Sequence, residues 1–161
     1  MNALLFTLTL ISALGSALVA GAFYAFSSFV MRGLTALPPE RGLAAMQSIN
    51  VTAVTPGFMA GFMGTTLLTA ATAVTALVTG LEHGMAWLLA GCALYLVGVF
   101  VETAVVHVPR NNALAALDPS DPASAGAWAR YASVWTAWNH VRTVAALAAT
   151  ACLVLALVAQ P

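Results

Sequence analysis

The 161-residue sequence contains no lysine, and only 6% of its residues are charged. Soluble proteins carry about 25% charged residues, so this scarcity of charge excludes an ordinary soluble domain. The five arginines balance five acidic residues, which gives a formal net charge of zero. A chain without net positive charge is a poor ligand for polyanions, so we predict no nucleic-acid partner.

The sequence also lacks the usual signatures of several chemistries. Its two cysteines, Cys92 and Cys152, lie inside apolar runs, and we interpret them as buried free thiols. Nucleotide-binding loops and serine or cysteine nucleophile motifs do not occur. Glu102, His107 and His140 are compatible with a two-histidine, one-carboxylate metal set. The HxxxH, CxxC and ExxH spacings are missing, however, so we predict no metal and no cofactor.

Long apolar runs make up most of what remains, since 61% of the residues are apolar. Four segments reach the roughly 20 helical residues needed to cross a bilayer: residues 3–31, 55–81, 85–106 and 138–159. The first is too long for a cleaved signal peptide and lacks a basic flank. Because backbone groups in lipid must be satisfied within the segment, we predict an all-α fold. Its form is a single domain, an antiparallel bundle of four transmembrane helices.

The connections between these segments predict a topology. Pro38-Pro39 and Asp121-Pro122 can each start a helix, which predicts short interfacial helices in the first and third connections. All arginines lie in or next to these two connections: Arg32, Arg41, Arg110, Arg130 and Arg142. Positively charged loops face the cytoplasm. We therefore predict a multi-pass cell-membrane protein with both termini outside and the first and third loops in the cytoplasm.

Small residues recur four apart in the first two segments: Ala17, Gly21 and Ala25, then Gly57, Gly61 and Thr65. Such runs let helices approach closely in lipid. They predict packing within the bundle or between the protomers of a homo-oligomer. In the third segment, Gly91, Tyr95, Gly98 and Glu102 form one stripe, which predicts that Glu102 faces the bundle.

Two polar clusters interrupt the apolar pattern, E-T-A-V-V-H-V-P-R-N-N at residues 102–112 and W-T-A-W-N-H-V-R at residues 135–142. Glu102 and Arg142 lie at similar depth when each residue rises 1.5 Å along its helix. A charge in hydrocarbon is normally paired or lines a cavity. We predict that Glu102 and Arg142 pair or share one polar network. The residues alone favour equally a functional site and a salt bridge that only fixes the register of the bundle.

The two clusters also carry a resemblance. At V-P-R-N-N-A-L-A-A-L-D-P (residues 108–119) and W-T-A-W-N-H-V-R-T (residues 135–143) the sequence resembles the DUF1772 membrane family, also called the anthrone oxygenase family. F-S-x-F-V-M-x-G-L, L-P-P and M-Q-x-I-N fit the same pattern, so the resemblance covers nearly the whole chain. It implies a four-helix membrane protein, and fungal members oxidise anthrones to anthraquinones with O₂ and without an evident cofactor. The family often has asparagine at the position of His107, which favours His140 as the base.

The resemblance implies roles for individual residues. The partners would be the lipid bilayer, O₂ and a flat hydrophobic aromatic molecule with an acidic C–H. We expect His140 to remove that proton, because the histidine side chain is the one best suited to general-base catalysis near neutral pH. Arg142 and Asn139 would stabilise the oxyanion, and Glu102 would orient one of them. The expected substrate-binding residues are the following: His107, Asn111, Asn112, Trp135, Trp138, Tyr24 and Asn50.

The alternative is a non-enzymatic four-helix membrane protein that binds a lipid, a quinone or a partner helix. In that case the polar clusters only hold the bundle together. A closed, aromatic-lined pocket beside the clusters would favour the enzyme, and clusters fully packed with side chains would favour the alternative.

Overall fold

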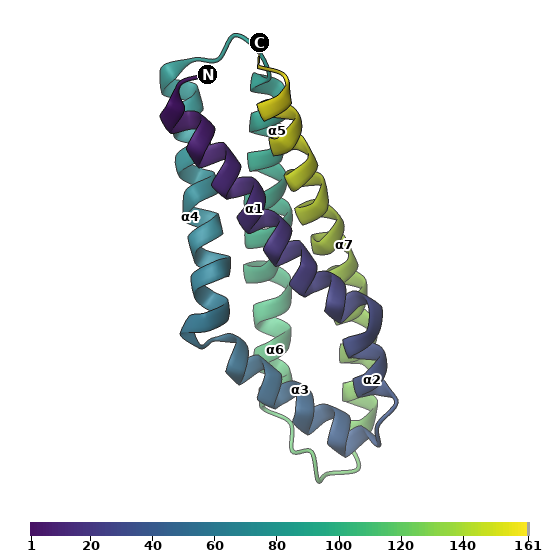
Figure 1. Ribbon diagram of the computed structural model, residues 1–161. Helices are drawn as coiled ribbons and strands as arrows, with labels where there is room; N and C mark the ends of the chain where they lie inside the picture. Colours follow the sequence, from purple (N-terminus) through teal and green to yellow (C-terminus); the bar gives the residue numbers. More distant parts are fainter. Residues whose placement is uncertain (161) are drawn as a thin grey trace.

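The computed structural model describes residues 1–160, which contain helices, turns and loops and no strand. Four long helical rods lie side by side in an elongated bundle (Figure 1). Each is long and apolar enough to cross a membrane: Ala3–Thr35, Pro56–Thr79, Met85–Ala115 and Ser124–Val158. The all-helical fold with four candidate spans is therefore confirmed, while the cell membrane as its location stays a prediction.

The first rod is made of three segments that follow one another without a break. They are α1 (Ala3–Ala25), η1 (Phe26–Val30) and α2 (Met31–Thr35). Asn2 starts the rod, because its side chain accepts a 2.8 Å hydrogen bond from the Leu5 amide, one of the unpaired donors at a helix N-terminus. The middle segment η1 is a π-helix, in which hydrogen bonds join residues five apart.

The third rod contains two more π-helical segments. It consists of α5 (Met85–Tyr95), η2 (Leu96–Val101), η3 (Thr103–His107) and α6 (Val108–Ala115). Wide turns of this kind are rare and occur mostly as single-turn bulges inside α-helices, frequently at functional sites. An α-helical pattern of 3.6 residues per turn gives no sign of them, so the sequence did not predict them.

The second and fourth rods are uninterrupted α-helices, α4 (Pro56–Thr79) and α7 (Ser124–Val158). Pro56 suits the first turn of α4, where its missing N–H would have no partner. The last of these, α7, extends over 35 residues and runs from the third connection through the last span.

The two connections with predicted interfacial helices differ. The first contains α3 (Pro39–Ala53), which starts at the predicted proline pair. The third contains no separate helix among its described residues, because α6 ends at Ala115 and the helix that starts at Ser124 belongs to α7. Asp121 stabilises the turn before α7 by accepting a 2.9 Å hydrogen bond from the Ala123 amide. A position of α3 at the membrane interface stays a prediction.

Small residues bring the third and fourth rods close together. A Cβ on Gly98 would lie 2.7 Å from the Cβ of Ala145, and one on Gly91 would lie 2.9 Å from Leu153 Cγ. Tyr95 is fully buried, and the predicted inward stripe of the third span is therefore confirmed. By contrast, Ala17 and Gly21, two of the regularly spaced small residues in the first span, are exposed. Its role in a homo-oligomer stays a prediction.

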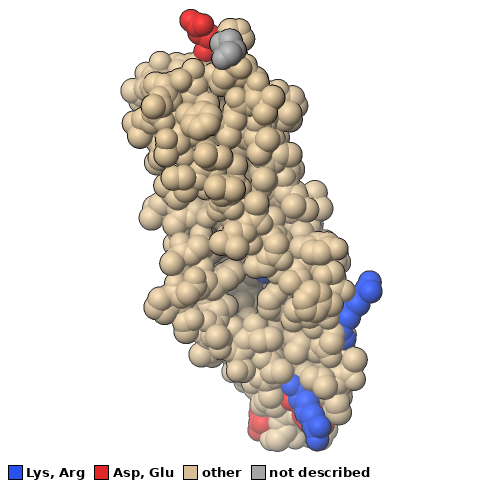
Figure 2. Space-filling model, in the orientation of Figure 1, with Lys and Arg blue, Asp and Glu red and all other residues tan. Residues whose placement is uncertain are grey.

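The arginines gather toward one end of the bundle. The α4–α5 connection and both termini lie at one end, and α3 with the α6–α7 connection lies at the other (Figure 1). On the face drawn in Figure 2, the arginines lie in the lower half, toward α3. This agrees with the predicted clustering, and the side of the membrane that this end faces stays a prediction.

Candidate functional site

A cavity of about 750 Å³ lies toward the arginine-bearing end of the bundle. Its walls come from α1, η1, α3, α4, the stretch from η2 to α6, and α7. Figure 2 shows the surface hollowed at this level, with arginine atoms visible inside, and Arg142 is the arginine that lines the cavity. Small-molecule sites typically measure about 300–1,000 Å³. The polar clusters are thus not packed solid, although the cavity opens to the surface and is not the closed pocket that the sequence-based criterion for an enzyme describes.

Aromatic rings form much of the cavity wall: Phe23, Phe26, Phe58, Phe62, Phe100 and Trp135. Phe62 sits at their centre. Its ring stacks on Phe58 with centroids 6.0 Å apart, and it contacts Phe23 edge-on at 6.4 Å. Flat, rigid walls of this kind favour a flat apolar ligand, because ring faces and edges pack well against another aromatic system.

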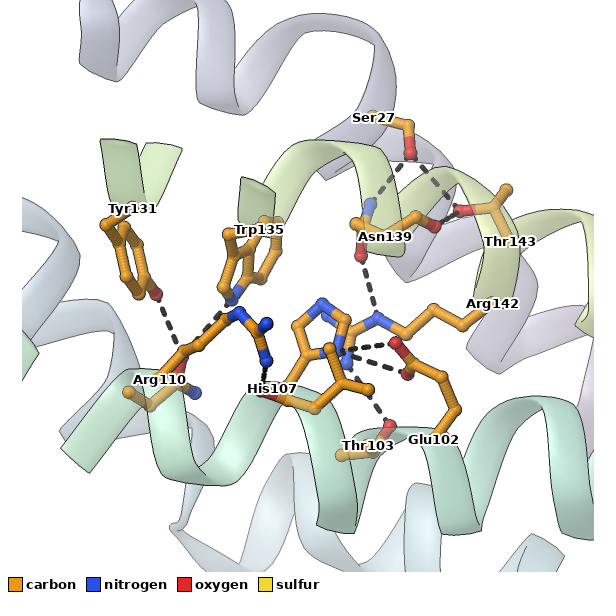
Figure 3. A network of polar contacts seen from close by, with 12 residues as sticks. Ser27, Glu102, Thr103, His107, Arg110, Tyr131, Trp135, Asn139, Arg142 and Thr143 are labelled. Atoms are coloured by element: carbon orange, nitrogen blue, oxygen red, sulfur yellow. Dashed lines mark hydrogen bonds and ion pairs between the residues drawn. The ribbon is translucent and has the colours of Figure 1, made fainter. Parts of the chain in front are cut away.

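Glu102 and His107 form a buried pair on the third rod. His107 Nδ1 lies 3.1 Å from each carboxylate oxygen of Glu102, and the exposed fractions of the two residues are 1% for the histidine and 8% for the glutamate. Five residues of an α-helix turn through about 500°, which would leave these side chains about 140° apart. The π-helical segment η3 reduces this offset, because its wider turn brings residues five apart toward the same face. Figure 3 shows both side chains on the same side of the rod.

This pairing fixes the state of the imidazole. An ionised carboxylate only accepts hydrogen bonds, so the contact to Glu102 places the proton of a neutral His107 on Nδ1. Nε2 then carries the lone pair. That nitrogen is buried and has no hydrogen-bond partner among residues 1–160, although the ring lines the cavity and packs edge-on against Trp135 at 5.0 Å. His107 is therefore an oriented group with an unused acceptor.

Arg142 brings a buried positive charge to the same cavity. Its Nε donates to Asn139 Oδ1 at 2.8 Å, and its Nη1 donates to Thr103 Oγ1 at 3.3 Å. The guanidinium carbon lies 3.9 Å from the centroid of the Phe23 ring and 5.1 Å from that of Trp135. Cation–π contacts in a desolvated site are worth about 2 kcal/mol or more. The guanidinium is thus held in one place, between α1 and the third rod.

Asn139 holds Arg142 and does not line the cavity. It is fully buried, and its amide nitrogen donates to the Phe23 carbonyl at 2.8 Å and to Ser27 Oγ at 2.7 Å. Thr143 Oγ1 lies 3.2 Å from the same serine hydroxyl (Figure 3). The amide therefore ties the first rod to α7, and it has no free donor for a substrate oxyanion.

Two more amides line the cavity, one from α6 and one from α3. Asn111 Oδ1 accepts hydrogen bonds from Tyr131 Oη at 2.8 Å and from Trp135 Nε1 at 3.2 Å. Asn50 comes from α3, and its Nδ2 is buried without a hydrogen-bond partner among the described residues. Both side chains were expected near the substrate, and both line the cavity.

Six residues expected in the site do not line the cavity. Asn139 and Glu102 lie behind its wall, where they contact Arg142 and His107, and the structure corrects the placement of the other four. His140 and Asn112 are exposed, each beside an inward-facing neighbour and turned by about 100° on the helix. Tyr24 and Trp138 are 61% and 39% exposed on outer faces. Each belongs to the right stretch of sequence but to the wrong face of its helix.

The predicted link between Glu102 and Arg142 is also changed. No ion pair joins them among residues 1–160, because Glu102 pairs with His107 and Arg142 bonds to Thr103, the residue after Glu102. They share one polar region rather than one bond. The metal set considered from the sequence is not assembled either, since His140 faces outward, and the described residues contain no other group of three potential ligands.

Sequence reasoning missed Thr103 and most of the phenylalanines of the wall. Two spacings carry the missing signal. Thr103, His107 and Asn111 follow each other at intervals of four, and so do Phe58 and Phe62. Residues four apart share one helix face. All five line the cavity.

Comparison with protein families matches residues 57–152 to the family described as anthrone oxygenase. The matched region runs from the start of α4 to near the end of α7 and contains Glu102, His107 and Arg142. No curated protein and no solved structure matches the chain.

Proposed function

Since the chain belongs to the anthrone oxygenase family, we propose that it oxidises an anthrone-like aromatic compound to a quinone with O₂. The methylene carbon of the substrate loses two hydrogens and gains one oxygen, and the second oxygen atom leaves as water. The observation that carries this proposal is His107, which lines an aromatic-walled cavity and pairs with the buried Glu102. Residues of a purely structural cluster would be packed without such a space.

The first step is removal of a proton from the methylene carbon. His107 Nε2 takes this proton, in place of His140, which lies outside the cavity. General-base catalysis of this kind contributes about 10²–10⁴-fold to a rate. Glu102 positions the ring and stabilises the imidazolium that forms, as a carboxylate does behind a catalytic histidine. The product is a resonance-stabilised enolate with high electron density on the former methylene carbon.

The second step consumes O₂. One electron passes from the enolate to O₂, and the resulting radical and superoxide combine to a peroxide on that carbon. Loss of the remaining C–H proton with cleavage of the O–O bond gives the carbonyl and water. Arg142 supports this step, because its buried positive charge beside His107 stabilises negative charge as it develops on oxygen.

The bilayer supplies the substrate in this proposal. The hollow visible in Figure 2 lies on the side where the cavity is lined by α1, α3 and α4. A flat apolar molecule dissolved in lipid can reach it without crossing water. The arginine-bearing end faces the cytoplasm in this arrangement, following the positive-inside rule.

Turnover of emodin anthrone by the purified protein in detergent tests the proposal. We expect quinone formation above the spontaneous rate in air, none under argon, and one labelled oxygen atom in the product under ¹⁸O₂. Metal content is assayed on the same sample, and turnover that rises with bound metal would overturn the direct transfer to O₂. Absence of turnover with retained binding of lipid quinones would favour the non-enzymatic alternative, for which the apolar cavity is equally suited.

A further inference from the structure

We infer that Asn50 and Asn111 form a carbonyl-binding pair, which restricts the substrate of the proposed reaction to aromatic ketones whose C=O lies across a ring from the acidic carbon. This inference rests on the proposed function, because it assigns a purpose to two amides in the same cavity. Neither amide takes part in the contacts that hold Glu102, His107 and Arg142.

The orientation of the Asn111 amide follows from its partners. Trp135 Nε1 can only donate a hydrogen bond, so the atom 3.2 Å away must be the oxygen of Asn111. The Tyr131 hydroxyl donates to that same oxygen at 2.8 Å. With its oxygen engaged twice, the side chain has only its NH₂ left to donate, and Asn111 lines the cavity.

Asn50 supplies the second donor from a different element. It lies near the end of α3, the helix whose last turns close the cavity beside α4. Its Nδ2 is buried and makes no well-formed hydrogen bond among residues 1–160, although the side chain lies near the Tyr131 hydroxyl that also contacts Asn111. A buried amide without a partner costs about 1–3 kcal/mol. A ligand carbonyl in the cavity satisfies that donor.

The spacing between base and donors defines the ligand. Asn111 is four residues beyond His107, which corresponds to about 6 Å along the third rod. A substrate that presents its acidic C–H to His107 therefore places a group on the far side of the same ring near Asn111 and Asn50. In an anthrone this group is the carbonyl oxygen, which also receives the negative charge when the C–H proton leaves. Two amide donors at that point stabilise the enolate.

A pair of ligands with the same shape tests the inference without any turnover. Anthraquinone carries carbonyl oxygens and anthracene does not, and binding of each is monitored by quenching of tryptophan fluorescence, since Trp135 lines the cavity. We expect Asn50→Leu and Asn111→Leu each to weaken anthraquinone binding roughly tenfold. Binding of anthracene should stay unchanged, because it makes no hydrogen bond.

The matched control is Asn112→Leu, which changes the same residue type one position away on an exposed face. It should leave both ligands unaffected. Undiminished anthraquinone binding in both leucine variants would overturn the inference, and so would an equal loss of both ligands in folded protein. If a leucine variant fails to fold, the corresponding serine variant, Asn50→Ser or Asn111→Ser, takes its place. It must weaken the binding of anthraquinone and leave the binding of anthracene unchanged.

The two proposals fail in different ways. Selective binding of anthraquinone that depends on Asn50 and Asn111, in a protein that turns over no anthrone, would keep the carbonyl pair and reject the oxygenase. Turnover of emodin anthrone that is unchanged in both leucine variants would keep the oxygenase and reject the carbonyl pair.

Discussion

The third and fourth rods carry similar residues at the arginine-bearing end of the bundle, but the two helices differ there in geometry. The third rod has Glu102 and His107 five residues apart, around the π-helical segment η3. The fourth has Asn139, His140 and Arg142 on an uninterrupted α-helix. On α7 the ordinary turn of 100° per residue holds, so Asn139 and Arg142 face inward together and His140 points outward. On the third rod the wide turn brings an otherwise separated pair together.

The difference shows how one inserted residue can make a site. A π-helical turn accommodates an extra residue while the helix beyond it keeps its orientation. Before η3 the third rod packs closely on α7 through Gly91 and Gly98, and after it α6 contributes Asn111 to the cavity. The acid–base pair sits at the wide turn itself.

Deleting one residue from the third rod and, separately, one from the fourth should give the largest difference in turnover between the two rods. Without Val141, Arg142 rotates by about 100° away from Asn139, so we expect loss of folding or at least a 100-fold loss of turnover. Without Ala104, Glu102 and His107 become four apart, a spacing that shares a face in an ordinary α-helix. That protein should fold and keep turnover within about tenfold. Emodin anthrone oxidation and melting temperature in detergent check both, and equal sensitivity would contradict the role given to η3.

Two arginines on α7 give the next largest difference. Arg142→Met removes the charge that Asn139 and Thr103 bind and leaves buried polar atoms unpaired, which should lower the free energy of unfolding by about 2–3 kcal/mol. Arg130 is exposed nearer the start of the same helix, and Arg130→Met should change it by less than about 0.5 kcal/mol. Denaturant titration in detergent measures both values. A stable Arg142→Met protein would mean that the buried network does not hold the bundle.

Substitutions at two glycines, one on an inner face and one on an outer face, should change the free energy of unfolding by smaller and different amounts. Gly98 lies against Ala145, so Gly98→Leu must push the third rod from α7 and should cost about 1–3 kcal/mol. Gly21 has open space where a Cβ would be, and Gly21→Leu should stay within about 0.5 kcal/mol in the monomer. The same titration applies. A large effect at Gly21 would instead indicate that another chain packs on the first rod.

Much of the fold could be predicted from the sequence because apolar length and helix periodicity suffice to define it. Four spans and the helix that starts at the Pro38-Pro39 pair were predicted on those grounds and are confirmed. The site could be predicted only in part. Depth along each helix placed Glu102 and Arg142 at one level, but the direction of a side chain depends on every turn before it. Three π-helical segments change that direction, and sequence periodicity contains no sign of them.

The choice between the two histidines depends directly on this point. Sequence reasoning favoured His140 for the intrinsic chemistry of histidine and because the family often has asparagine at the position of His107. The structure gives His107 a carboxylate partner and a cavity, and it leaves His140 on an exposed face. Chemical type could not separate them, because orientation decides which imidazole can reach a ligand.

The most direct test is the rate of oxygen-dependent emodin anthrone oxidation by His107→Gln and His140→Gln, measured side by side in detergent. We expect the first substitution to lower the rate by about 10²–10⁴-fold and the second to leave it within about twofold. Loss of activity in His140→Gln together with retained activity in His107→Gln would contradict this account. His107 would then not be the base, and neither its pair with Glu102 nor the wide turn of η3 would serve catalysis.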